Sequence, residues 1–167
     1  MPLSSDLLSF VIRPTGPGSS TQWSVFGAPT NWEAVAEEGA MDSAFVQSAG
    51  DLVPTQGDTD LYAATQIHGR IIQATVRAYA TLIGGFGVPA LRLILRVSGV
   101  NAYSDPMSLN KGTLLYQWTS TPEAGGPVEI GVENYAGVGG MRVQQIWAEM
   151  LIQKRGRVRR YHRRVGR

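Results

Sequence analysis

The sequence predicts an all-β protein, a jelly roll or β-sandwich followed by an extended basic C-terminal tail. Two segments, 70–83 and 90–97, alternate apolar and polar side chains with a period of two, which is typical of strands with one buried face. The 167 residues include 20 Gly and 9 Pro, a composition that suits short strands joined by tight turns. Turn signals separate further short apolar runs along the chain, as they do in sandwiches and barrels.

The clearest strand signal lies at residues 70–83. Its apolar face is formed by Ile72, Ala74, Val76, Ala78, Ala80 and Leu82. Its polar face is formed by Gln73, Thr75, Arg77, Tyr79 and Thr81. In 90–97, Leu91, Leu93, Leu95 and Val97 alternate with Arg92, Ile94 and Arg96, and the glycine-rich segment 84–89 separates the two runs. Alternating runs joined in this way are typical of a hairpin, so we expect 70–83 to pair with 90–97.

Shorter apolar runs indicate further strands at residues 7–13, 43–48 and 113–119. In the last of these, Leu114, Tyr116 and Trp118 share one face. The Pro- and Gly-rich residues 14–20 predict a turn or linker. Residues 57–60, which include two aspartates, predict another turn, because Asp is a favoured turn residue.

Two segments are compatible with more than one structure. Residues 30–40 suit a short helix with Thr30 or Asn31 as its N-cap, and they equally suit a loop. Residues 142–153 contain good helix formers, but as a strand they place Ile146, Met150 and other apolar residues on one face. We favour a strand for 142–153, since most other elements of the chain are predicted to be strands and no helix cap is evident.

Composition divides the chain into an N-terminal arm at 1–20, a β-sandwich domain at 21–153 and a basic tail at 154–167. The tail holds eight cations and no anion, which leaves 7 of the 15 Lys and Arg for the other residues, together with all 13 Asp and Glu. Such a segment cannot pack in a core, so it predicts a partner-binding role. Its expected contact residues are Lys154, Arg155, Arg157, Arg159, Arg160, Tyr161, Arg163, Arg164 and Arg167.

The chemistry of arginine indicates what kind of partner the tail binds, because the planar guanidinium group binds a carboxylate or a phosphate with two hydrogen bonds. We favour an acidic surface on a neighbouring subunit, because the body of the chain is itself acidic. The alternative is nucleic acid, whose phosphates the arginines would neutralise while Tyr161 or His162 stacks on bases.

Residue types argue against most catalytic and metal chemistry. The chain has no Cys, which excludes disulfides, thiolate catalysis and Cys-based metal sites. It has two His, His68 and His162, far apart in sequence, and no G-x-S-x-G motif. We therefore expect no enzyme activity, no cofactor, no metal and no small-molecule substrate. No signal peptide and no stretch long enough to span a bilayer is evident, so we expect no membrane partner.

Aromatic side chains are the candidates for sugar recognition, since an exposed ring can stack on the flat face of a sugar. Four Trp and several Tyr lie along the chain, and most of them are expected in the core, where aromatics contribute large buried areas. We take Trp23, Trp32 and Trp118 as the possible glycan-stacking residues.

The order of features along residues 20–153 resembles a family of virion structural proteins. The sequence has an early Trp23, the turn at 57–60 before Leu61 and Tyr62, the alternating segments described above and a Tyr-x-Trp strand at 116–118. The loop at 121–127 (TPEAGGP) and the strand around 144–152 follow. This pattern is similar to lectin-like jelly-roll proteins of tailed bacteriophages, found as tail, collar, or head appendage and decoration proteins.

The resemblance implies a structural role in a virion assembled in the host cytoplasm, as a symmetric homo-oligomer that also contacts other virion proteins. Our first hypothesis is such a protein, anchored to neighbouring subunits through 154–167. The alternatives are a carbohydrate-binding module for attachment to a host surface, and a nucleic-acid-binding protein that acts through the tail.

Overall fold

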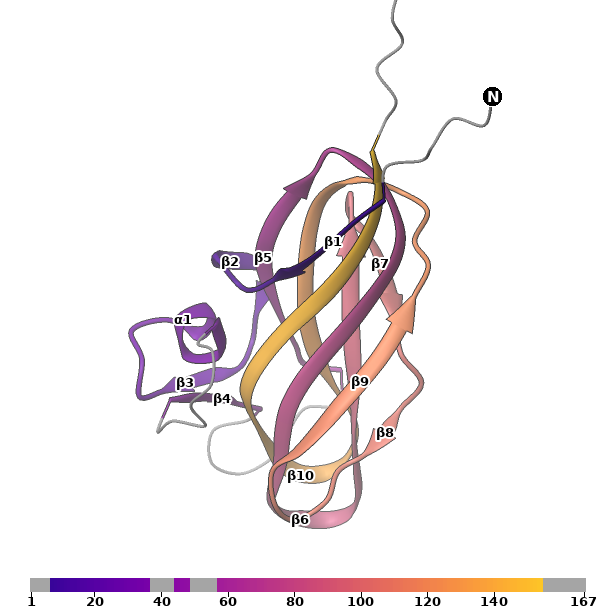
Figure 1. The fold of residues 1–167 in the computed structure, drawn as a ribbon. Helices are drawn as coiled ribbons and strands as arrows, with labels where there is room; N and C mark the ends of the chain where they lie inside the picture. Colours follow the sequence, from indigo (N-terminus) through magenta and orange to yellow (C-terminus); the bar gives the residue numbers. More distant parts are fainter. Residues whose placement is uncertain (1–6, 37–43, 49–56, 155–167) are drawn as a thin grey trace, which may run out of the picture.

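The computed structural model describes residues 7–36, 44–48 and 57–154. Within them lie ten β-strands and one α-helix (Figure 1). The elements in chain order are β1 (Leu7–Ile12), β2 (Gly16–Thr21), β3 (Ser24–Phe26), α1 (Asn31–Ala36), β4 (Phe45–Gln47), β5 (Thr59–Ile67), β6 (Gly69–Val97), β7 (Val100–Tyr103), β8 (Met107–Ser108), β9 (Leu114–Ser120) and β10 (Gly126–Lys154).

Two strands of 29 residues each, β6 and β10, form the frame of the fold. They pair antiparallel along their whole length, from Gly69 opposite Lys154 to Val97 opposite Val128. Halfway along, Gly84 lies opposite Gly140 and Gly85 opposite Gly139, and the register shifts nearby. Glycine permits the sharp bend that the paired strands make there, and each strand continues from one layer of the molecule into the other (Figure 1).

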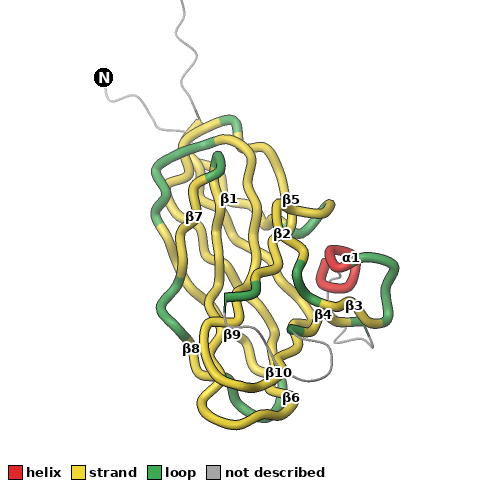
Figure 2. The backbone as a smooth tube through the Cα atoms, turned by 180° about the vertical axis from the view of Figure 1, so that it is seen from behind, coloured by secondary structure: helices red, strands yellow, loops and turns green. Residues whose placement is uncertain are grey.

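The bend divides the strands into two packed antiparallel sheets. The first sheet has the order β9, the first half of β6, the second half of β10, and β1, with β4 beside β10 further along and β3 beside β4. The second sheet contains β7 and β8, the second half of β6, the first half of β10, β5 and β2. Helix α1 stands with β3 and β4 at one side of the sandwich (Figure 2).

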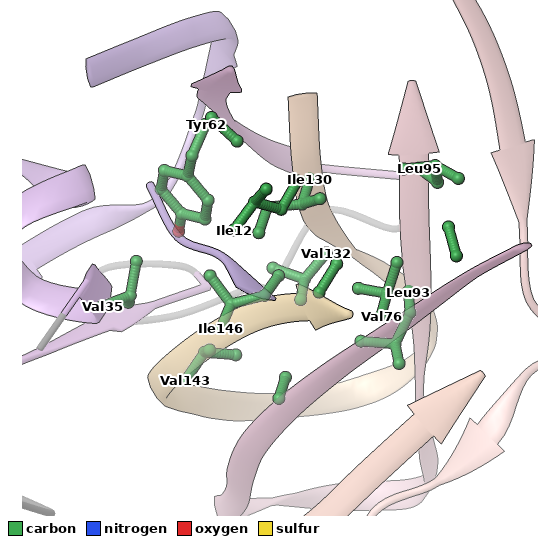
Figure 3. Packing of buried hydrophobic residues seen from close by; sticks show 14 of the residues in the cluster. Ile12, Val35, Tyr62, Val76, Leu93, Leu95, Ile130, Val132, Val143 and Ile146 are labelled. Atoms are coloured by element: carbon green, nitrogen blue, oxygen red, sulfur yellow. The ribbon is translucent and has the colours of Figure 1, made fainter. Parts of the chain in front are cut away.

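The core lies between the inner faces of the two sheets (Figure 3). Ala74, Val76, Ala78 and Ala80 of the first sheet are fully buried, which confirms the middle of the predicted apolar face of 70–83. At its ends, Ile72 and Leu82 are only partly buried, and a register shift beside Ile152 turns Ile71 inward in place of Ile72. Leu91, Leu93 and Leu95 are fully buried from the second sheet. The small alanines allow the sheets to lie close together, while each leucine buries a larger apolar side chain.

Several sequence predictions are confirmed. The chain is an all-β sandwich, and 142–153 is part of strand β10. Helix α1 begins where a cap was expected, because the Thr30 carbonyl accepts from the Ala34 N–H at 3.1 Å and the Thr30 hydroxyl donates to Glu33 at 2.6 Å.

Other predictions are wrong. Segments 70–83 and 90–97 do not pair with each other, because each pairs with β10 and the glycines between them form a bend. Residues 14–20 are not a linker, since β2 pairs with β5. Asp60 lies in strand β5, where its side chain is fully buried, and not in a turn. Strands β1 and β2 both begin within the stretch 1–20 taken as an N-terminal arm, and they belong to the two sheets.

Candidate functional site

The outer face of the first sheet gathers an unusual set of side chains for a solvent-facing surface. Alternate residues of its strands point outward, and neighbouring strands place Gln117, Arg77 and Trp147 in one row across β9, β6 and β10. Arg13, directly after β1, continues this row beyond Trp147. In the adjoining row, Tyr79 lies opposite both Leu115 and Gln145.

Two aromatic rings occupy the middle of this face. Tyr79 and Trp147 contact each other with ring centroids 5.6 Å apart and planes tilted by 39°. Both side chains are partly exposed, and the guanidinium carbon of Arg13 lies 5.8 Å from the Trp147 ring centroid. The rings therefore offer apolar area to solvent while their neighbours fix their positions.

Charged and amide groups surround the rings. Arg77 forms an ion pair with Glu149 and donates from Nε to the Gln117 side chain at 3.1 Å. We call Arg13, Arg77, Tyr79, Gln117, Trp147 and Glu149 the aromatic platform. Its rings can stack on a flat apolar face of a ligand, and its amide, guanidinium and carboxylate groups can bond to hydroxyls along the ligand's edge.

The outer face of the second sheet is different, because its long side chains bond to one another across the strands. Arg92 pairs with Glu133 at 3.7 Å, and Arg96 pairs with Glu129 at 3.5 Å. The Arg92 guanidinium also stacks on Tyr135, 3.7 Å from the ring centroid. Ile94 is fully buried in the middle of this strand, and Tyr103 opposite it is 43% exposed, with the Arg92 guanidinium carbon 5.9 Å from its ring centroid.

A hollow of about 370 Å³ lies where α1 meets β2 and β5, and Trp32 is part of its wall. The remaining lining residues are Pro17, Thr21, Pro29, Thr30, Asn31, Leu61 and Tyr62. Most of the lining is apolar, and Trp32 is half-buried and packs against the core. The hollow is a second candidate for a ligand, with few polar groups to orient one.

Beside this hollow lies a buried polar cluster centred on Asp60. Its Oδ2 accepts hydrogen bonds from the Asn31 amide and the Tyr62 hydroxyl, both at 2.8 Å, while Oδ1 has no partner. Burial raises the pKa of Asp60 to about 6, against the smaller opposing effect of hydrogen bonds from Asn31, Tyr62 and the Gln22 backbone. The Asn31 amide also donates to the Trp23 carbonyl at 2.7 Å, so the cluster ties α1 to β5.

The structure separates the three tryptophans predicted to stack on glycans. Trp23 is only 4% exposed and donates from its indole N–H to the Asp58 carbonyl at 3.3 Å, so it belongs to the core. Trp118 lies opposite Val76 on the inner face of the first sheet. Trp32 alone reaches a hollow. Of the predicted tail contacts, Lys154 ends β10 and the others lie outside the described residues.

Tyr79 and Trp147 were not among the selected stacking residues, although the alternation of their strands could have identified them. Tyr79 falls on the polar face of 70–83, and Trp147 has the opposite parity to Ile146 and Met150. A large aromatic residue on the polar side of an alternating strand is the signal that points to an exposed ring.

The part of the chain that the structure describes has neither a cluster of metal ligands nor a long apolar helix. No group of three or more acidic or His side chains there could hold a metal ion. Helix α1, the sole helix in these residues, has six residues and is too short to cross a bilayer.

Comparison with known proteins identifies the architecture. Neither a protein-family model nor a curated protein matches the sequence. Among solved structures, the xylan-binding module CBM15 matches with a TM-score of 0.54 at 10% identity, covering 91% of this chain and 100% of the module.

Two further structures match at a TM-score of 0.50. The CBM22-1 xylan-binding domain of Xyn10C from Paenibacillus barcinonensis is 14% identical, with coverage of 93% of this chain and 100% of the domain. The C-terminal CBM6 of LamC from Zobellia galactanivorans is 9% identical, with coverage of 86% and 99%. The chain is thus an all-β, two-sheet antiparallel β-sandwich that resembles the jelly-roll folds of carbohydrate-binding modules.

Proposed function

We propose that this protein is a non-catalytic carbohydrate-binding module and that the aromatic platform is its glycan-binding surface. The observation that carries the proposal is the Tyr79–Trp147 pair, partly exposed on the outer face of a sheet and framed by Arg77, Glu149 and Gln117. Partly exposed aromatic rings beside hydrogen-bonding side chains suit a sugar, whose ring has apolar faces and a polar edge.

The dimensions of the platform favour an extended glycan. The row from Gln117 on β9 to Arg13 after β1 crosses three strand spacings, or about 14 Å. A surface of that length contacts a short run of consecutive sugar units. Two of the similar structures are named for xylan binding, which makes xylan the first polysaccharide to test.

The test is binding of the full-length protein to soluble xylan and to an array of other polysaccharides, followed by calorimetry on the best ligand. Trp147→Ala removes the central ring, and we expect it to lower the affinity about thirtyfold, as truncation of a central aromatic anchor does. Trp32→Ala is the matched control, since it also removes one half-buried Trp that packs against the core, but from the hollow beside α1 and not from the platform.

The outcomes separate the two candidate sites. Loss of binding in Trp147→Ala with little change in Trp32→Ala supports the platform. The reverse pattern would move the ligand to the hollow and refute the assignment of the platform. Absence of binding to every polysaccharide tested would refute the proposed function itself.

A role in a virion, as tail, collar or capsid-associated protein, stays a prediction from the sequence. A glycan-binding surface is compatible with it, because attachment to a host surface requires recognition of carbohydrate. The separation of charge between 154–167 and the rest of the chain supports a second proposal, that the tail anchors the module to an acidic subunit or to nucleic acid.

A further inference from the structure

We propose that the open edge of β1 pairs with β1 of a second copy, so that the first sheet continues through a two-fold axis into the partner. This proposal concerns assembly and is independent of whether the aromatic platform binds glycans. It rests on the open backbone of β1, on its exposed apolar side chains and on the way its sequence matches itself in the antiparallel direction.

Strand β1 lies at the edge of the first sheet. In the part of the chain that the structure describes, it pairs with β10 alone, through all six of its residues. Every second residue of β1 therefore points its backbone N–H and C=O groups away from β10, toward the open edge of the sheet. Edge strands are normally protected by Lys, Pro or a bulge, and residues 7–12 (LLSFVI) contain neither of these residue types and show no register shift.

The side chains of β1 are apolar on both faces of the sheet. On the outer face, Leu7 is 51% exposed and Val11 is 52% exposed. On the inner face, Leu8 is 40% exposed and Phe10 is partly buried. Isolated exposed apolar residues are ordinary, but three of them beside a partly buried Phe on one edge strand indicate a surface that another chain covers.

The sequence of β1 is self-complementary. In an antiparallel pair with the two-fold axis beside Ser9, Leu7 lies opposite the partner's Val11 and Leu8 lies opposite the partner's Phe10. Residues that face one another in this register have the same parity, so they project from the same face of the joined sheet. Each exposed apolar side chain of the strand thus meets another, and the small Ser9 lies at the axis.

The space beside β1 is suited to receive the partner's inner-face side chains. Two hollows of about 340 and 490 Å³ flank Phe10 between β1 and β5, and Thr65 lines both. The first is also lined by Leu8, Ile67 and Ile152, which form an apolar wall. A second copy of β1 would extend the first sheet over this gap, and its own Leu8 and Phe10 would cover it.

Segments of the same chain fit this edge less well. Residues 1–6 include Pro2, which has no backbone N–H to donate to a neighbouring strand. Residues 155–167 carry seven arginines, whereas β1 is apolar and is flanked by the cations Arg13 and Lys154. A second copy is the occupant that matches both the length and the character of the strand.

The experiment is sedimentation of the full-length protein over a wide range of concentrations, with variants that test the register. We expect a monomer–dimer equilibrium for the unaltered chain. Leu7→Lys/Val11→Lys places like charges opposite one another at both symmetry-related positions, and we expect the dissociation constant of the dimer to rise about a hundredfold. Leu7→Glu/Val11→Lys places opposite charges there instead, and it should largely restore the dimer.

Two controls keep the result clear. Val100→Lys introduces a charge at a 73% exposed apolar residue of the second sheet, and it should leave the dissociation constant unchanged. Circular dichroism and thermal melting verify that each variant is folded, as expected for substitutions at exposed positions.

Three results would overturn the proposal. One is a monomer at every concentration. Another is a dimer that Leu7→Lys/Val11→Lys does not weaken. The third is a monomer whose β1 amides exchange slowly with deuterium until 155–167 are deleted, which would assign the edge to the tail.

Discussion

Replacement of Asp60 by Asn should make the stability of the protein less dependent on pH between about 4 and 6. Asp60 is fully buried, and burial raises its pKa from 3.8 to about 6. The folded protein therefore holds this proton more tightly than the unfolded chain does. Stability from Asp60 is fully present below about pH 4 and is lost as the pH rises through about 6.

The size of the effect follows from the shift in pKa. One pKa unit corresponds to about 1.4 kcal/mol, so a shift of about two units makes the free energy of unfolding about 3 kcal/mol lower above pH 6 than below pH 4. Asn cannot ionise, and its carbonyl oxygen can still accept hydrogen bonds from Asn31 and Tyr62. Asp60→Asn should thus gain stability relative to the unaltered protein as the pH rises.

The assay is urea unfolding of both proteins at several pH values from 4 to 7.5, and the quantity of interest is the difference between their free energies of unfolding. Other titrating groups cancel in this difference because the two chains share them. A difference that stays constant across this range would show that Asp60 ionises as it does in water, and it would refute the account of a desolvated carboxylate beneath α1.

The other predictions concern packing and partner binding. Gly131→Ala should lower the free energy of unfolding by more than about 3 kcal/mol, because an added Cβ would overlap the Asp60 backbone oxygen. Gly16→Ala, with no atom within 4 Å of the added Cβ, is the control in the same urea assay. Tyr62→Phe removes a buried hydrogen bond to Asp60, and it should cost about 1 to 3 kcal/mol at pH 7 in chemical denaturation. Deletion of 155–167 removes seven arginines and should abolish salt-dependent binding to DNA in a fluorescence titration, if the tail contacts nucleic acid; unchanged binding would place any such contact elsewhere.

Much of the fold could be predicted from the sequence because a strand with one buried face carries its periodicity in a few residues. Residues 74–80 show this clearly, and so does 142–153, where alternation outweighed good helix formers. The pairing of 70–83 could not be predicted in the same way. Glycines at 84–87 are compatible with a hairpin or with a bend, and what decides between them is the partner strand β10, far along the chain.

The candidate site was harder to predict than the fold, for a physical reason. Trp23, Trp118 and Trp147 are the same residue type, so residue type alone does not distinguish them. Only the direction in which each side chain points separates a ring in the core from an exposed one. Asp60 illustrates the same difficulty, since aspartate in a Gly-Asp-Thr-Asp sequence favours a turn, yet β5 begins one residue earlier and carries it inward.

The pairing of β6 with β10 also has a consequence for how the protein folds. Gly69 pairs with Lys154 and Val97 with Val128, so partner residues lie between 31 and 85 positions apart in the chain. The two long strands cannot pair with each other until the chain between them has closed into a loop, and the entropy of that closure is lost before their contacts compensate for it. Folding should therefore be slow for a domain of this size, and β6 has one edge without its partner, prone to aggregation, until β10 has been synthesised.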